Sequence, residues 1–264
     1  MALLALCAGT IPLLLLVSRD LLPARADTVL ATDTFARTVS NGWGSADVGG
    51  AWTILDSAST WSVAPGTGSI TTPANAQARG ILEGAVAQDV DLLAEIALPR
   101  CASNCDAFLV GRASSDSAPS YYRVGVVQST SGGNVSIRAQ RGDGTLISGD
   151  VNTGIAAADG VVLWLRVQMQ GVYPTAIRAR AWLAGSSEPA SWTLNATDGN
   201  AAQQISGAVG VRVRIEDTTA AHTVRCMSYQ ASVLSSPPPT PTPSGTPTPT
   251  PVSGTFASDG FQRS

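Results

Sequence analysis

The chain has 264 residues, a formal net charge of −3 and a charged share of only 13%. This slightly negative total gives no support for a nucleic-acid-binding surface. Once an N-terminal export segment and a C-terminal linker are set aside, roughly 200 residues remain, which is enough for one sizeable hydrophobic core.

Residues 1–26 predict a secretory signal peptide. The run from Leu3 to Val17 is almost entirely apolar, and it is followed by Ala24-Arg25-Ala26, an Ala-x-Ala site after which we expect cleavage. The run is short for a membrane span, which needs about 20 apolar residues. An uncleaved membrane anchor is the alternative. We therefore expect a secreted or cell-surface protein with no membrane contact after signal cleavage.

Two aspartates near the start of the mature chain are the candidate metal ligands. Asp33 and Asp47 lie in or beside a Gly-rich segment whose backbone carbonyls offer further oxygens, and Ca²⁺ binds oxygen ligands. We expect no cofactor other than this structural calcium. The alternative is that Asp47 caps the turn at 42–50. Trp43 and Trp52 in the same segment are interpreted as core residues rather than sugar-stacking ones, because burial of a large ring stabilises a turn-rich region.

Three cysteines remain after removal of the signal peptide. A disulfide persists in an oxidising compartment, and a separation of four residues can bring two Cα atoms within bonding range. We therefore predict a disulfide between Cys101 and Cys105, with Cys226 as a buried thiol in a strand. A bridge from Cys226 to one of the other two is the alternative.

From residue 28 to residue 234 the hydrophobic pattern has a period of two. In residues 161–170 every second side chain is apolar and falls on one face, namely Leu163, Leu165, Val167 and Met169. Residues 175–182 and 209–215 alternate in the same way, as strands with one buried face do. Many short strands between turn clusters predict an all-β domain over residues 27–234, a two-sheet antiparallel β-sandwich or jelly roll.

The faces of these strands that point away from the core combine Arg with aromatic residues. Guanidinium groups beside aromatic rings suit carboxylated or sulfated sugars, through bidentate contacts and stacking. We therefore predict a ligand-binding sheet face, to which Arg138 also belongs, formed by Tyr121, Arg123, Trp164, Arg166, Arg178, Arg180, Trp182, Arg212 and Arg214. The alternative is an ordinary solvated face whose Arg residues prevent edge pairing. If the residues fall on two different sheets, the single surface does not exist.

Residues 235–254 are rich in Pro and Thr. Because Pro fixes φ and lacks an amide donor, this stretch predicts an extended linker rather than a core. After the linker, the pattern Asp259-x-Phe261-x-Arg263 repeats Asp33-x-Phe35-x-Arg37 from the start of the domain. Residues 255–264 are therefore interpreted as the start of a second, truncated repeat.

The segment from Asp33 to Trp52 resembles the opening of concanavalin A-like (laminin-G-like) jelly-roll modules of secreted bacterial proteins. Residues 164–192 and 205–210 resemble the second half of such modules, so the resemblance covers nearly all of residues 28–234. It implies a two-sheet sandwich, and its members often hold a structural calcium. The superfamily includes sugar lectins, polysaccharide hydrolases and structural spacers, and the fold alone does not choose among them.

No catalytic constellation stands out in the sequence. Glycoside hydrolysis uses two carboxylates, and laminarinase-type members of the superfamily carry a Glu-x-Asp-x-(x)-Glu strand. Here Asp89, Asp91 and Glu95 give a different order of acids, and the single His222 does not build a multi-His metal site. We therefore predict that this chain is not an enzyme, although a catalytic domain beyond residue 264 remains open.

Together these features predict a secreted, non-catalytic binding module of a multi-modular extracellular protein. Its expected partner is a glycan or cell-surface polymer and not a nucleic acid. Tandem modules on a stalk favour avidity, since two linked weak sites gain about 10²–10⁴ in apparent affinity. The alternatives are a structural spacer or adhesin repeat without a ligand, and an accessory module of a glycoside hydrolase.

Overall fold

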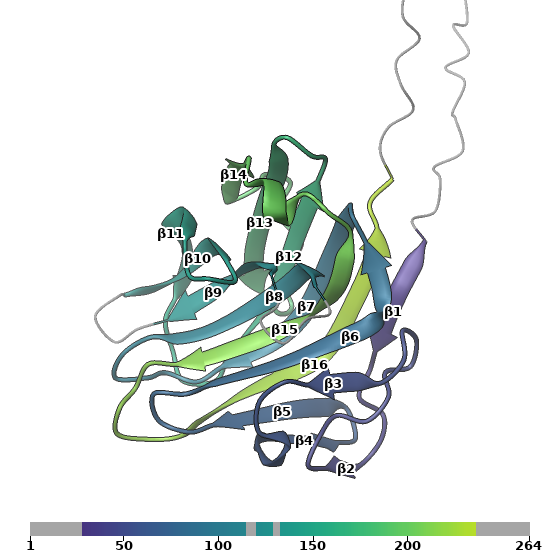
Figure 1. Ribbon diagram of the computed structural model, residues 1–264. Helices are drawn as coiled ribbons and strands as arrows, with labels where there is room; N and C mark the ends of the chain where they lie inside the picture. The colour runs from purple at the N-terminus through teal and green to yellow at the C-terminus, as the bar shows by residue number, and fades with distance from the viewer. Residues whose placement is uncertain (1–27, 115–119, 129–132, 236–264) are drawn as a thin grey trace, which may run out of the picture.

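The computed structural model describes residues 28–114, 120–128 and 133–235 (Figure 1). The predicted signal peptide, the Pro-Thr linker after residue 235 and the predicted repeat at 255–264 lie outside these residues and stay predictions. The described residues form antiparallel strands with two short 3-10 helices, η1 (Ala58–Thr60) and η2 (Ala201–Gln203). Within these ranges, no helix has the length and apolar character needed to cross a membrane.

The described strands form two sheets. The nine-stranded sheet contains β1 (Val29–Asp33), which pairs with β16, and has the strand order β14 (Leu194–Asp198), β13 (Thr175–Leu183), β12 (Val161–Gln170), β7 (Val90–Leu98), β16 (His222–Val233), β5 (Thr67–Thr72), β4 (Trp61–Ala64) and β2 (Val39–Ser40). The seven-stranded sheet has the order β11 (Leu146–Ala156), β10 (Asn134–Arg141), β9 (Tyr122–Gln128), β8 (Cys105–Ala113), β15 (Gly207–Ile215), β6 (Gln77–Ala87) and β3 (Trp52–Ile54). The prediction of an all-β, two-sheet antiparallel sandwich is confirmed (Figure 1).

The two ends of the described domain lie side by side. Strand β1 begins where β16 ends, because the two strands are antiparallel and Val29 pairs with Ser232. Figure 1 shows the start of β1 next to the end of β16 at one edge of the sandwich.

The core between the sheets follows the period-two pattern. The predicted inward side chains of β12 are all buried: Leu163, Leu165, Val167 and Met169. At one end of the core, Trp43 makes edge-to-face contacts with Phe35, Trp52 and Trp61, with ring centroids 4.6–5.0 Å away. Such aromatic pairs stabilise a core beyond the area that they bury. Trp43 and Trp52 are therefore core residues, as the sequence indicated.

The Asp-x-Phe-x-Arg pattern has a structural role in the first turn of the domain. Phe35 adopts a positive φ of 55° and buries its ring in the core. Its amide donates to Asp33 at 2.9 Å, and two Arg37 nitrogens donate to the two Asp33 oxygens at 2.7 Å each. Arg37 also donates to the Trp43 carbonyl, with 2.8 Å between Nε and O. The motif thus joins a buried ion pair to the aromatic cluster.

The seven-stranded sheet departs from simple alternation. Every residue of β8 and β9 is buried, and β15 is buried except at Arg214. In a two-layer sandwich, one face of each strand is expected to meet solvent. The outer face of this sheet is therefore lined by side chains that bury one another, and it carries the candidate site described below.

Candidate functional site

The nine predicted ligand-binding residues lie on two sheets. Five belong to β12 and β13 of the nine-stranded sheet: Trp164, Arg166, Arg178, Arg180 and Trp182. The other four belong to the seven-stranded sheet: Tyr121 directly before β9, Arg123 on β9, and Arg212 and Arg214 on β15. Because the inner faces enclose the core, the two outer faces point in opposite directions. The prediction of one continuous surface is wrong, since alternation indicates which face a residue occupies but not which sheet.

The arginines on the nine-stranded sheet are engaged with a loop that covers them. Arg166 forms an ion pair with Asp91 and also donates to Glu188, with 3.1 Å between Nη1 and Oε1. Arg180 Nε donates to the same Glu188 oxygen at 2.7 Å, and its guanidinium lies 4.1 Å from the ring centroid of Trp192. Glu188 and Trp192 both belong to the β13–β14 connection. These contacts hold that connection against the sheet.

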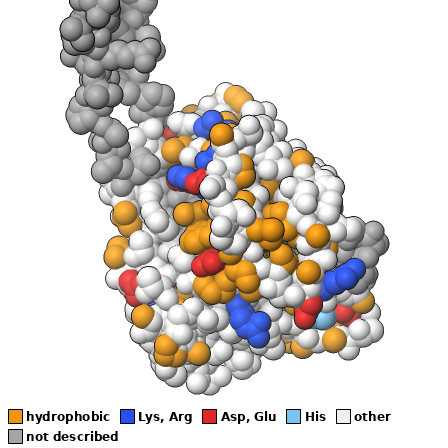
Figure 2. All heavy atoms as spheres, turned by 180° about the vertical axis from the view of Figure 1, so that it is seen from behind, with side chains coloured by type: hydrophobic (Ala, Val, Ile, Leu, Met, Phe, Trp, Pro, Cys, Tyr) orange, Lys and Arg blue, Asp and Glu red, His pale blue; other side chains and the backbone are white. Residues whose placement is uncertain are grey.

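Two tryptophans form a stack on the same outer face. Trp164 and Trp182 are opposite each other in the β12–β13 register, with 6.4 Å between ring centroids and 16° between ring planes. Trp182 is only 8% exposed, so little of its ring is left for a sugar. Figure 2, which views the molecule from behind, shows hydrophobic side chains gathered across the middle of one face with charged side chains around them. Ligand binding by Trp164 and Trp182 stays a prediction.

The outer face of the seven-stranded sheet brings different residues together. The register aligns five positions in one row across β6, β15, β8, β9 and β10, namely Arg79, Arg212, Phe108, Gly125 and Arg138. Arg123 lies two residues before Gly125 on β9, so it faces the same side of the sheet, and it pairs with Val110 of β8. The face is therefore a band of guanidinium groups around a buried phenyl ring.

Two of these guanidinium groups lie on the same ring. The Arg123 and Arg212 guanidinium carbons are each 5.6 Å from the Phe108 ring centroid. Arg123 is 8% exposed and Arg212 is 6% exposed, and the Nε atom of each has no hydrogen-bond partner among the described residues. Burial and the neighbouring Arg123 charge lower the pKa of Arg212 to about 10.

A carboxylate with an unusual titration lies on the same face. Asp106 is buried, its Oδ2 is 3.7 Å from Arg138 Nη1, and its Oδ1 has no partner among the described residues. Burial raises the pKa of Asp106 to about 7, although the attraction of Arg138 opposes this effect. Strongly shifted ionisable groups gather at functional sites more often than elsewhere.

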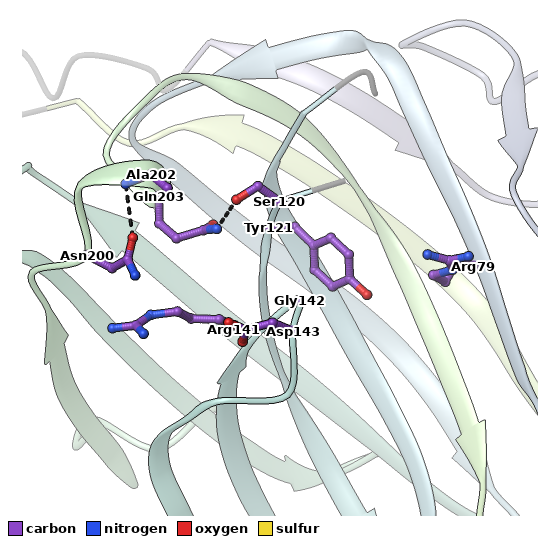
Figure 3. Close-up of a pocket in the computed structure, with 9 residues that line it drawn as sticks. All are labelled: Arg79, Ser120, Tyr121, Arg141, Gly142, Asp143, Asn200, Ala202 and Gln203. Carbon is purple, nitrogen blue, oxygen red and sulfur yellow. Dashed lines mark hydrogen bonds between the residues drawn. The ribbon is translucent and has the colours of Figure 1, made fainter. Parts of the chain in front are cut away.

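Two hollows open on this side of the sandwich. The first, of about 430 Å³, is lined among others by Arg79, Ser120, Tyr121, Arg141, Asn200 and Gln203 (Figure 3). The second, of about 270 Å³, is lined among others by Ile81, Ala113, Ile205 and Ala208. Tyr121 lines the first hollow and packs in one apolar cluster with Ile81, Ala113 and Ala208, which line the second. In Figure 3 its hydroxyl points toward Arg79.

Sequence reasoning missed four residues of this face: Arg79, Phe108, Asp106 and Arg141. Arg79 alternates with buried Ala78 on β6, so the same period-two reasoning was available for it. Phe108 and Asp106 lie in the continuously buried strand β8, where alternation gives no sign of the outer face. Arg141 ends β10 and forms an ion pair with Asp198, a contact between distant segments that no local pattern indicates.

The calcium prediction gains no support from the contacts of the two aspartates. Each Asp33 oxygen accepts two hydrogen bonds, from Phe35 and Arg37 at Oδ1 and from Arg37 and Trp52 at Oδ2. The Arg37 guanidinium thus occupies the place of a cation. Asp47 Oδ2 accepts from the amide and hydroxyl of Thr34 at 2.8 and 2.6 Å, and these bonds lower the Asp47 pKa. Asp47 is therefore bonded to the segment that follows β1, and not to the turn at 42–50 that the alternative named.

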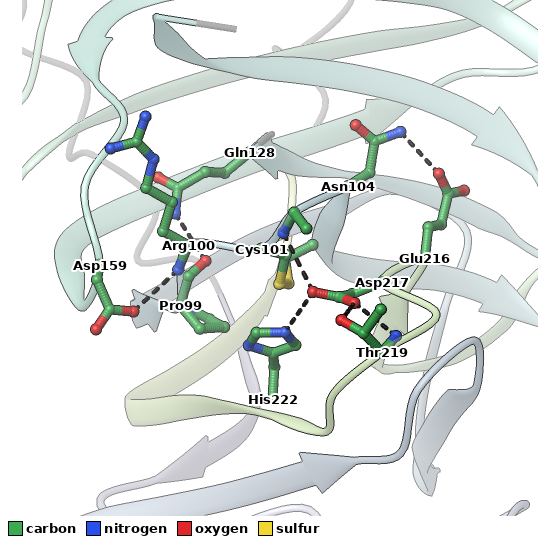
Figure 4. Close-up of a disulfide and its surroundings, with 12 residues drawn as sticks. Pro99, Arg100, Cys101, Asn104, Gln128, Asp159, Glu216, Asp217, Thr219 and His222 are labelled. Carbon is green, nitrogen blue, oxygen red and sulfur yellow. Dashed lines mark hydrogen bonds and ion pairs between the residues drawn. A yellow bond between two sulfur atoms is a disulfide. The ribbon is translucent and has the colours of Figure 1, made fainter. Parts of the chain in front are cut away.

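Cys101 and Cys105 form a disulfide between β7 and β8, with 5.8 Å between Cα atoms (Figure 4). His222 lies beside it, and its Nε2 is 2.9 Å from Asp217 Oδ2. Cys226 is a buried free thiol whose pKa is raised by burial. The His222–Asp217 pair and the disulfide therefore lie side by side at one end of the sandwich, where the Ala102 amide also donates to Asp217.

Comparison with known proteins identifies the fold but no family. No protein-family model matches the chain, and no curated protein matches its sequence. Among solved structures, the chain is similar to the GH43 protein BlXynB of Bacillus licheniformis, with a TM-score of 0.51, 13% identity, and coverage of 77% of this chain and 39% of that one. A bifunctional GH43-CE protein of Bacteroides eggerthii gives a TM-score of 0.50 at 14% identity, over 83% of this chain and 27% of that one. The carbohydrate-binding module CBM66 of Bacillus subtilis gives 0.47 at 14% identity, over 69% and 94%.

These similarities correct one prediction. The sequence analysis predicted that the chain is not an enzyme, whereas the solved structures that it matches with TM-scores of 0.50 and 0.51 are GH43 proteins. The prediction relied on the absence of one acid motif within a single strand and on the presence of only one histidine, although catalytic carboxylates need not come from one strand. The chain spans about two fifths of the length of BlXynB. At these identities, the similarity shows the fold alone.

Proposed function

We propose that this domain recognises carbohydrate through the outer face of its seven-stranded sheet. In this proposal the sandwich is of the concanavalin A-like type, and it serves a protein that acts on or adheres to glycans. The observation that carries the proposal is the hollow of about 430 Å³ at Tyr121, which is lined by guanidinium, amide and hydroxyl groups. Concave sites with a few convergent polar groups are the usual form of small-ligand sites.

The first hollow has the chemistry that a sugar needs. A sugar ring presents hydroxyl groups that donate and accept, and Ser120, Asn200 and Gln203 offer both functions at the wall of the hollow. The Gln203 amide donates to Ser120, while its Oε1 has no partner among the described residues. A buried acceptor without a partner is unfavourable, so a hydroxyl donor from a ligand would stabilise it.

The extracellular setting and the modular arrangement belong to the same proposal. The disulfide between Cys101 and Cys105 supports an oxidising compartment. The Asp-x-Phe-x-Arg pattern at Asp33 has a structural role, so its recurrence at Asp259 supports a second domain of the same kind. A cell-surface polymer is the expected ligand of such an arrangement.

Affinity electrophoresis of the full chain in gels with a panel of dissolved polysaccharides tests the proposal. We expect Arg79→Gln and Tyr121→Phe to reduce retardation by a polysaccharide that retards the parent protein. The matched control is Trp164→Phe, on the opposite sheet, which we expect to leave retardation unchanged. The reverse pattern would place the binding surface on the nine-stranded sheet and overturn the proposal.

A further inference from the structure

Three arginines at the rim of the seven-stranded sheet have carboxylate partners, whereas the two buried arginines at its centre have none among the described residues. At the rim, three arginines each contact a carboxylate: Arg79 with Asp56, Arg138 with Asp150 and Arg141 with Asp198. At the centre, Arg123 and Arg212 have no ion pair with any carboxylate of the described residues. Within the described part of the chain, the Arg212 side chain donates only to the neutral amide of Gln77, with 3.0 Å between Nη2 and Oε1.

This arrangement is unfavourable without a counter-ion. Both central guanidinium groups are more than nine-tenths buried and share the Phe108 ring, so they repel each other where water screens them little. Buried arginines are almost always paired, because removal of a charge from water is costly. The phenyl ring compensates only in part, since a cation–π contact contributes about 0.5–2 kcal/mol. An anion at this point would form charge-assisted hydrogen bonds with groups that lack partners.

The central pair lies next to the larger hollow. A Cβ atom added to Gly144 would be 3.7 Å from Arg123 Nη2, so this guanidinium lies against the β10–β11 turn. Residues Gly142 and Asp143 of the same turn line the hollow, together with Arg79 and Tyr121. Of the charged side chains in the lining, Arg79 is paired with Asp56 and Arg141 with Asp198, while Asp143 has no ion pair among the described residues. Asp106 attracts both central arginines and Asp143 attracts Arg123, in each case without an ion pair. Arg123 and Arg212 are therefore the buried cations beside the hollow that lack a carboxylate partner among the described residues.

From this juxtaposition we propose that the ligand of the seven-stranded sheet is an anionic glycan, whose charged group binds at Arg123 and Arg212 beside the hollow at Tyr121. The inference rests on the proposed function and adds the chemical class of the ligand. The charged group is an anionic oxygen group on a sugar. A uronic acid supplies it as a carboxylate, and a sulfated sugar supplies it as a sulfate ester.

The test compares polysaccharides that differ only in charge. Polygalacturonate is compared with its methyl-esterified form, and dextran sulfate with dextran, by affinity electrophoresis and calorimetric titration of the full chain at low salt. We expect at least tenfold tighter binding to a charged polymer than to its neutral counterpart, and a loss of this preference at 0.5 M salt, where charges are screened within about 4 Å. The two pairs of polymers distinguish a carboxylate from a sulfate as the preferred group.

Variants assign the charge preference to the central arginines. Arg123→Met and Arg212→Met remove the charge with little change of volume, and we expect each to weaken binding of the charged polymer about tenfold or more. The control is Arg225→Met, which removes an exposed Arg from β16 of the other sheet and is expected to change binding less than twofold. Thermal unfolding of each variant shows whether it is folded before binding is compared.

The outcomes separate the inference from the proposed function. Equal binding of charged and neutral polymers, reduced by Arg79→Gln, would overturn the inference and leave carbohydrate recognition in place. Equal weakening by Arg225→Met and Arg212→Met would also overturn it, because binding would then reflect the total charge. Absence of binding to every polymer of a wide panel would overturn both.

Discussion

Asp106 offers a direct measurement of what burial costs a carboxylate on the seven-stranded sheet. Its pKa is raised from 3.8 to about 7, mainly because burial disfavours the carboxylate. The shift of about three pKa units corresponds to about 4 kcal/mol at 1.36 kcal/mol per unit, an upper limit on what the charge costs the folded state. We therefore expect Asp106→Asn, which keeps the shape and removes the charge, to stabilise the protein at high pH.

The sign of the pH dependence follows from the proton balance. The folded protein holds the Asp106 proton up to about pH 7, while the unfolded chain releases it near pH 4. This group therefore makes stability fall as pH rises from about 4 to about 7, and its full cost is present above pH 7. In the Asn variant that contribution is absent. Arg138 keeps its ion pair with Asp150, with 2.6 Å between Nε and Oδ1, so the lost contact to Asp106 has a small effect.

Urea unfolding at pH 4.5 and pH 8 measures the effect. The difference in unfolding free energy between variant and parent is expected to be near zero at pH 4.5 and to favour the variant by up to about 4 kcal/mol at pH 8. Other titrating groups contribute equally to both proteins and cancel in this difference. The reasoning would be refuted if the difference in unfolding free energy between variant and parent were the same at both pH values. It would also be refuted if this difference favoured the variant less at pH 8 than at pH 4.5.

Three further predictions concern stability. Asp33→Asn leaves the Arg37 guanidinium without its buried partner, and we expect a loss of about 3 kcal/mol in urea unfolding, with no change on addition of calcium. Cys105→Ala opens a five-residue ring, which in the chain-entropy account costs about 2 kcal/mol; reduction of the parent protein should give the same loss, and a much larger one would implicate Cys226. Trp164→Ala removes one ring of the Trp stack and is expected to lower the melting temperature while polysaccharide retardation persists; loss of retardation in a folded variant would assign the ligand to the nine-stranded sheet.

The strand pattern was readable from sequence wherever one face of a strand is buried. In β12, the alternation of Leu163 with Trp164 correctly separates core from surface. In β8 it fails, because the outer residue Phe108 is buried by Arg123 and Arg212 from neighbouring strands. Alternation reports the environment of one strand, whereas burial on an outer face depends on side chains that arrive from other parts of the chain.

The sequence predicted only some residues of the candidate site and assigned them to one surface together with residues of the other sheet. Arg166 and Arg212 follow the same local pattern, yet they lie on opposite sides of the molecule because their strands belong to different sheets. The partners that distinguish them are also distant in sequence: Arg166 meets Glu188, while Arg212 meets Phe108. Strand order and the position of the β13–β14 connection are set by the whole fold, so they cannot be inferred from a period of two.

The adjacency of the domain's two ends determines how it would respond to mechanical load. The start of β1 pairs with the end of β16, with Val29 opposite Ser232. A pull that separates these two ends acts at one end of the β1–β16 ladder, so its hydrogen bonds would break one after another rather than share the load. A domain suspended in this way would open at low force by peeling β1 away, while the remaining strands of the sandwich lie outside the line of tension.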